Sequence, residues 1–230
     1  MQNDNPGATH ANDDIAQLTA EIREAVAHGG DIEKTVRNLT LKAMHANGLD
    51  PESLVRIAAA VMEGAHEGAQ HELSHASEQS QAAQTQIIQA VAGLDAAFAQ
   101  LAGASKLALE EAASKAKQFS HSELAKTRAD LESLESLFMD TLKQAATAAQ
   151  GLIAETLQDL YQHAERNGTA VGAQLKDTLA VFAHQMASTG RAQLEAGAQL
   201  TQITADLLHK IASGVLTGIV DQVKQADKNK

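Results

Sequence analysis

The residues best suited to chemistry form one short motif, HELSH, at positions 71–75. In the HExxH arrangement, two histidines one helical turn apart bind Zn²⁺, and the glutamate between them acts as general base on the metal-bound water. The ligands here would be His71 and His75, Glu72 would be the base, and Glu78 is a conceivable further ligand. The motif therefore makes a zinc-dependent hydrolase one alternative for this chain.

The surroundings of the motif favour a different interpretation. Gln81 stands where a metzincin would supply its third histidine, and no strand pattern lies nearby to hold a substrate. Two neighbouring pairs, Glu63 with His66 and Glu72 with His75, match the ExxH pattern of di-iron bundles. They lie nine residues apart, which at about 100° per residue places them on opposite faces of one helix. We therefore expect a solvated helix face, no catalytic residue and no cofactor.

The composition predicts helices that meet along narrow seams. Of the 230 residues, 44% are hydrophobic but only 2% are aromatic, so the buried surface must come from Ala, Leu, Ile, Val and Met. Both prolines, Pro6 and Pro51, lie outside the expected helix interiors. The predicted fold class is all-α, an elongated helical bundle of coiled-coil-like long antiparallel helices with a small N-terminal helical unit.

Charge and cysteine content argue against several classes of partner and chemistry. The formal net charge of −11 disfavours nucleic acid and anionic membrane surfaces, because both bind clustered Lys and Arg. The absence of cysteine rules out disulfides, thiol chemistry and Cys-ligated zinc. Residues 1–10 are polar and lack the features of a secretory signal, so we expect a cytoplasmic protein.

The apolar runs of the chain are short. None approaches the roughly 20 apolar residues that span a bilayer, so no transmembrane span is predicted. The nearest run is Ile211 to Val220, which is more typical of the buried end of a bundle helix than of an interfacial anchor. A membrane-active helical effector that docks through this run is a further alternative.

The first third of the chain is predicted to form a tail followed by a group of short helices. Residues 1–11 lack periodicity and are predicted to form a disordered tail, with the first helix starting at residue 12 or 13. A unit of short helices follows over residues 12–62. Residues 63–86 are polar and should bury little surface. We expect a continuous but weakly packed helix there, with a linker as the alternative.

Residues with known capping roles mark the helix ends in this unit. The pair Gly29–Gly30 should end the first helix, and Asp31 should cap the second. The pair Asn47–Gly48 supplies left-handed conformations that end the second helix. Pro51 is suited to the first position of the third, where its missing N–H is not needed.

Two long amphipathic helices are the strongest pattern in the chain, within a long-helix bundle predicted over residues 87–220. Ser120 opens a capping box, which predicts a helix start there. The helix should continue unbroken to Asn167, over about 46 residues or roughly 70 Å. The second long helix should start near Thr169, and residues 221–230 should form a polar tail.

A short link at Asn167–Gly168 would make the two long helices antiparallel neighbours. Their apolar stripes would then need a third helix, a second chain or an apolar surface to cover them. We therefore predict a homo-oligomer, or a protein that covers an apolar granule or lipid surface, acting by packing rather than chemistry. The predicted interaction seam consists of Leu131, Leu134, Phe138, Leu142, Leu175, Leu179, Phe182, Ile211, Val215 and Ile219.

Glycine pairs with GxxxG spacing recur along the chain. In lipid this spacing favours close helix contact, and in a soluble Ala-rich chain it more often marks tight packing along a helix seam. The pairs are Gly64 with Gly68, Gly168 with Gly172, and Gly214 with Gly218.

Three segments resemble an uncharacterised bacterial all-helical family: residues 37–43 (RNLTLKA), 105–119 and 134–142 (LESLFMDTL). That resemblance implies no activity. Residues 87–220 are also similar in texture to phasins, the helical proteins that coat polyester storage granules, because they are rich in Ala, Gln and Leu and lack Cys and Trp. The similarity to phasins implies reversible docking of an apolar stripe on a hydrophobic surface, and a tendency to oligomerise.

Overall fold

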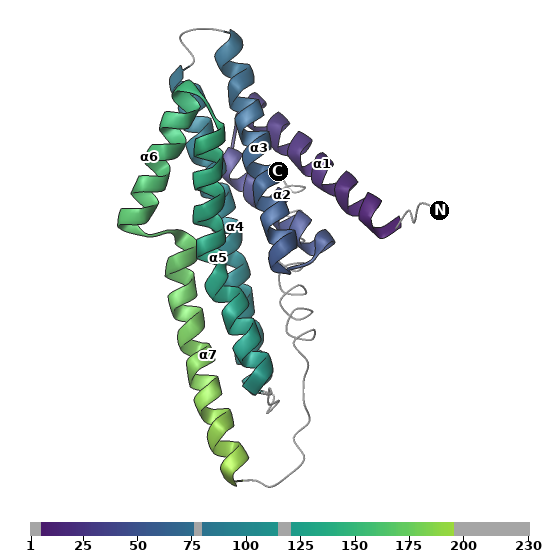
Figure 1. Cartoon of the computed structure of the whole chain (residues 1–230), viewed down its shortest axis with the longest axis vertical. Coiled ribbons are helices and arrows are strands. Elements are labelled where there is room, and N and C mark those ends of the chain that lie inside the picture. Colours follow the sequence, from purple (N-terminus) through teal and green to yellow (C-terminus); the bar gives the residue numbers. More distant parts are fainter. Residues whose placement is uncertain (1–5, 76–79, 115–120, 196–230) are drawn as a thin grey trace, which may run out of the picture. The chain divides into compact units, whose positions relative to one another are not determined.

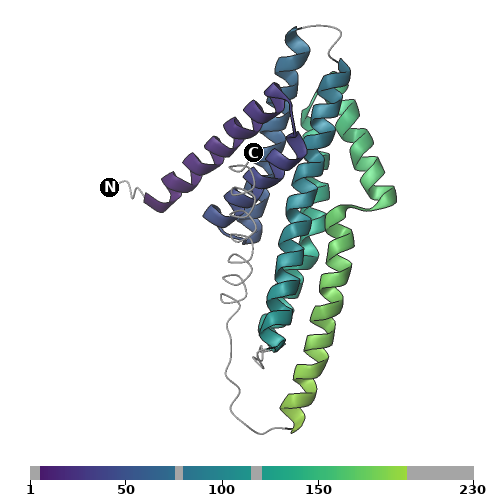
Figure 2. The same ribbon diagram turned by 180° about the vertical axis from the view of Figure 1, so that it is seen from behind.

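The structure is a computed structural model in which residues 6–75, 80–114 and 121–195 are described. Every element in these ranges is an α-helix and none is a strand, so the predicted all-α class is confirmed. Figures 1 and 2 show the helices from opposite sides. Their bounds are α1 Pro6–His28, α2 Ile32–Asn47, α3 Pro51–His75, α4 Ser80–Ser114, α5 His121–Ala148, α6 Gly151–Asn167 and α7 Ala170–Glu195.

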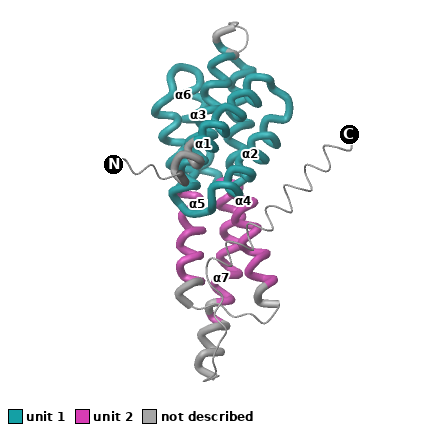
Figure 3. Tube along the Cα trace, turned by 90° about the vertical axis from the view of Figure 1, so that its right-hand side faces the viewer, with its two compact units in different colours: residues 1–97, 137–168 teal, residues 98–136, 169–230 magenta. Residues whose placement is uncertain are grey.

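The described residues belong to two compact units (Figure 3). Unit 1 takes its described residues from the ranges 1–97 and 137–168, and unit 2 from 98–136 and 169–230. Each unit is assembled from segments far apart in the sequence. Helices α4 and α5 contribute residues to both units.

The short N-terminal helices have the predicted boundaries, with one difference. Gly29 follows α1 with a φ of 73°, and Gly48 follows α2 with a φ of 92°. The Asp31 carboxylate accepts a hydrogen bond from the backbone N–H of Lys34, 3.2 Å away, and so caps α2. However, α1 begins at Pro6, so residues 6–11 are helical rather than part of the predicted tail. Proline is tolerated at the first helical position, and a polar first turn needs no apolar stripe.

The start of α3 confirms the predicted role of Pro51. Asp50 precedes it, and its carboxylate accepts a hydrogen bond from the backbone N–H of Ser53 at 2.9 Å. Burial acts to raise the pKa of Asp50, but hydrogen bonds from Ser53 and the charge of Arg56 outweigh it and lower the pKa. The ionised carboxylate therefore caps the helix at neutral pH.

Residues 64–69 in the polar part of α3 pack tightly against α1, so the expectation of weak packing is wrong for these residues. Ala65 and Ala69 are fully buried. A Cβ added at Gly68 would lie 2.7 Å from the backbone oxygen of Arg23 and 2.8 Å from Cβ of Val26. The expectation rested on the scarcity of large side chains, whereas small ones bury surface here by letting two helices approach.

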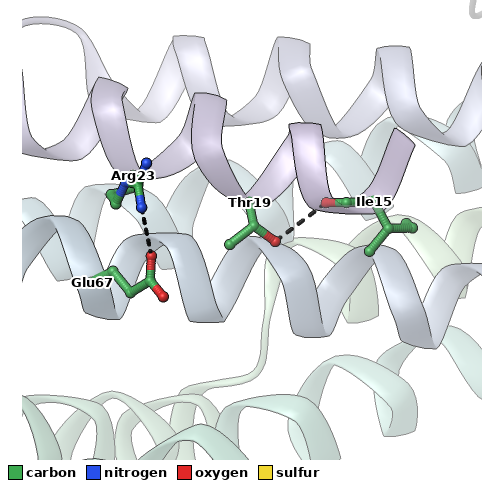
Figure 4. Close-up of polar contacts among 4 residues, drawn as sticks. All are labelled: Ile15, Thr19, Arg23 and Glu67. Atoms are coloured by element: carbon green, nitrogen blue, oxygen red, sulfur yellow. Dashed lines mark hydrogen bonds and ion pairs between the residues drawn. The ribbon is translucent and has the colours of Figure 1, made fainter. Parts of the chain in front are cut away.

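Gly64 makes the same kind of contact one turn earlier. A Cβ at this position would overlap the backbone oxygen of Thr19 and lie 2.9 Å from Cβ of Ile22. The predicted tight packing of the first GxxxG pair is thus confirmed. Alongside it, Arg23 of α1 and Glu67 of α3 form an ion pair at 3.4 Å (Figure 4), whose exposure makes it a minor contribution to stability.

The predicted unbroken helix from Ser120 to Asn167 is wrong. Helix α5 ends at Ala148, and α6 starts at Gly151 and turns back from the end of α5 (Figures 1 and 2). Between them Gln150 is extended and Gly151 has a φ of 56°. The apolar spacing continues through the break, so periodicity alone could not locate it. Ser120 itself lies outside the described residues, directly before the first residue of α5.

One described segment, Ser80–Glu111 of α4, is long and apolar enough to cross a membrane, by length and composition alone. Polar residues interrupt its apolar ones, so a search for uninterrupted apolar runs does not single it out. In its most apolar window, 56% of the residues are buried inside the protein. Core helices of globular proteins have this character too.

Candidate interaction site

The apolar stripes of α4, α5 and α7 form the core of unit 2. Side-chain hydrogen bonds place α7 beside both other helices: Thr178 donates from Oγ1 to the backbone oxygen of Ala102 on α4 at 3.1 Å, and Thr169 donates to Glu135 on α5. The largest buried side chains here are aliphatic or phenyl groups, as the composition predicted. They include Phe98, Leu101, Leu109, Leu124, Leu131, Leu134, Val171, Leu175 and Phe182.

The residues of the predicted interaction seam are mostly covered by the chain itself. Leu131, Leu134, Leu175 and Phe182 are buried in unit 2, where α4 is the third helix beside the stripes of α5 and α7. Phe138 and Leu142 are buried in unit 1. Leu179 is only half-buried. The remaining three predicted residues, Ile211, Val215 and Ile219, lie outside the described residues.

A polar latch joins the start of α7 to α5. The hydroxyl of Thr169 donates to Oε1 of Glu135 at 2.9 Å and accepts from the backbone N–H of Gly172 at 2.9 Å. A Cβ at Gly172 would lie 2.5 Å from Cδ of Glu135, so glycine leaves room for the carboxylate. A negative charge is favourable at a helix N-terminus. Sequence reasoning noted the glycine spacing at 168 and 172 but missed Glu135, which is distant in sequence and has no local signal.

Unit 1 contains an open groove of about 370 Å³ between α3, α5 and α6. Glu63 and His66, one of the two ExxH pairs, line it together with mostly small apolar residues. Space of this size beside α6 means that this helix is not closely packed against its neighbours along the groove. Among the residues that the structure describes, the lining consists of Ala59, Met62, Glu63, His66, Thr141, Gln144, Ala145, Ala148, Ala149 and Leu157.

Tyr161 is the only tyrosine of the chain and lies on α6. The ammonium group of Lys143 on α5 lies 6.0 Å from the centre of its ring. Its hydroxyl donates to Oε1 of Glu165 at 3.1 Å. This hydrogen bond is the main cause that raises the pKa of Tyr161, with smaller contributions from desolvation and from the charges of Glu165 and Asp140.

Glu165→Ala should lower the pKa of Tyr161 towards its ordinary value. The change removes both the acceptor that holds the phenolic proton and a nearby negative charge. The absence of tryptophan and of any second tyrosine lets absorbance near 295 nm follow this one group. As a control, Asp159→Ala removes a charge from the same helix without touching the hydrogen bond, and it should leave the titration almost unchanged. An unaltered curve for Glu165→Ala would contradict the contact.

The HELSH motif lies at the C-terminal end of α3. The side chain of His71 is exposed, while those of Glu72 and His75, and the whole of Glu78, lie outside what the structure describes. Among the described residues, no group of three His, Asp or Glu side chains is placed to hold a metal ion. The zinc alternative therefore stays an untested prediction.

Comparison with known proteins places the chain in a family. No curated protein and no solved structure matches it significantly. Residues 8–225 match the model of DUF6781, a family of unknown function. The match covers nearly the whole chain and agrees with the expected resemblance to an uncharacterised helical family, although it offers no support for the similarity to phasins. This chain therefore belongs to the DUF6781 family.

Proposed function

We propose that this protein is a non-enzymatic structural protein that self-associates through the apolar stripes of α5 and α7. The observation that supports this most is the exposure of Leu179: it belongs to the same seam as Leu134 and Phe182, which are buried within unit 2, but is itself only half-buried. Long helices with such stripes associate readily by side-chain packing. The half-buried position offers a second copy an apolar contact.

The charge of the chain sets how this association should respond to salt. Copies that each carry a formal charge of −11 repel one another at low ionic strength. The Debye length falls from about 30 Å at 0.01 M to about 10 Å at 0.1 M salt. Association should therefore strengthen as salt is added across this range.

Leu179→Asp should weaken self-association at least about tenfold, because an aspartate at the contact must be desolvated against apolar side chains. The measurement is light scattering over a concentration series, with the monomer mass of 24.2 kDa as the lower limit. Leu134 is a poorer position for this test, because it is 2% exposed and an aspartate there would disrupt the fold of unit 2 itself.

Ala173→Asp is the matched control. Ala173 is exposed on α7 and lies six residues before Leu179, so at about 100° per residue it points to a different side of the helix and the variant adds the same charge outside the proposed contact. It should associate like the wild type. A wild-type mass of 24.2 kDa at every protein and salt concentration would refute the proposal.

A further inference from the structure

The break between α5 and α6 depends on one glycine. Gly151 has a φ of 56°, a left-handed conformation that is unfavourable for residues with a Cβ. Gln150, at the N-cap position of α6, makes no side-chain capping hydrogen bond. The turn that sends α6 back from α5 therefore has little local stabilisation of its own.

The same residues can also form a continuous helix. The segment from Ala145 to Gln150 contains good helix formers and no proline, and the N–H of Ala149 still donates to the oxygen of Ala145 at 3.0 Å. In an unbroken helix, Ala146, Ile153 and Leu157 would share one face, because separations of seven and eleven residues return close to the same side. These three are buried in the broken form as well.

Helix α6 buries few of its side chains against the rest of unit 1. Of its 17 residues only Ile153, Thr156 and Leu157 are buried, and the open groove of about 370 Å³ runs beside Leu157. Release of α6 would nevertheless uncover Met62 of α3 and Thr141 of α5, which line that groove. The shape that fits this surface is α6 itself, so an identical α6 from a second copy fits it equally well.

We propose that two copies of this chain exchange their α6–α7 segments by straightening the hinge at residues 149–151. Helix α7 follows α6 directly, so the exchanged segment carries Leu175 and Phe182 into the core of the partner copy. Seam residues that are buried within one chain thereby become contacts between chains. Only residues 149 and 150 lie between α5 and α6, and such short hinge connections favour this type of exchange. The inference rests on the proposed self-association and specifies its route.

Two substitutions at the hinge should change the fraction of dimer in opposite directions. Gly151→Ala disfavours the left-handed turn and favours a continuous helix, so it should increase dimer formation roughly 30-fold per hinge, equivalent to about 2 kcal/mol. Gln150→Asp adds a capping side chain that stabilises the start of α6, so it should reduce dimer formation roughly fivefold. Both are measured by light scattering on the full chain.

Gly29→Ala is the matched control, because Gly29 also has a left-handed φ, 73°, and open space around an added Cβ, but it lies between α1 and α2. It should leave the dimer fraction unchanged. Hinge variants that associate just as strongly as a self-associating wild type would overturn the exchange while leaving self-association intact. A mass of 24.2 kDa for every variant would overturn both.

Discussion

Gly68→Ala should lower the free energy of unfolding of unit 1 by about 2–3 kcal/mol, although the same change in an ordinary helix is stabilising. The new methyl group would lie 2.7 Å from the backbone oxygen of Arg23 and 2.8 Å from Cβ of Val26. Neither atom is the end of a flexible side chain, so α1 and α3 must move apart. Urea unfolding followed by circular dichroism and by the fluorescence of Tyr161, which lies in unit 1, would measure the loss.

Gly103→Ala is the control for helix propensity. Gly103 lies within α4, and the nearest neighbour of an added Cβ would be Gln174 at 3.6 Å, an ordinary contact distance. This variant should be more stable than the wild type by about 0.5–1 kcal/mol. If Gly68→Ala were stabilising by a similar amount, the close packing of α1 against α3 at this position would be wrong.

Leu134→Ala should destabilise unit 2 by about 3 kcal/mol. Leu134 is 2% exposed, so the change removes buried methyl groups and leaves a cavity among the helices. Thermal or urea unfolding followed by circular dichroism would measure the difference. The effect should be seen as an earlier transition of unit 2, because Leu134 belongs to that unit.

Leu107→Ala makes the identical chemical change at an exposed position of the same unit. Leu107 is 53% exposed, so its loss should alter stability by no more than about 0.5 kcal/mol. Equal effects of the two variants would contradict the core placement of the α5 stripe. The contrast also separates the packing role of the stripe from general effects of removing leucine.

The local parts of the fold were predictable from the sequence. Gly29, Asp31, Gly48 and Pro51 act at the positions where their backbone preferences and capping groups predict helix ends. These signals depend on residues within about four positions of one another, so they do not require knowledge of distant contacts. The break at Gly151 was missed because a glycine between helix formers is compatible with both a bend and a continuous helix.

The candidate site was predicted less completely than the fold. Apolar spacing identified Leu131, Leu134 and Phe182 as packing residues, but it could not say which helix would cover them. The latch between Glu135 and Thr169 joins residues 34 positions apart and has no pattern in the sequence.

The sequence by itself determined the all-α class, the helix ends of the N-terminal unit and the positions of the apolar stripes, because capping, backbone preference and periodicity are local properties. The tertiary structure alone decided that α4 covers the stripes of α5 and α7 and that the chain turns back at Gly151. It also decided that α1 packs closely against Gly64 and Gly68 of α3. Each of these depends on which distant surfaces fit together, and small residues that look weakly packing in sequence allow the closest fit.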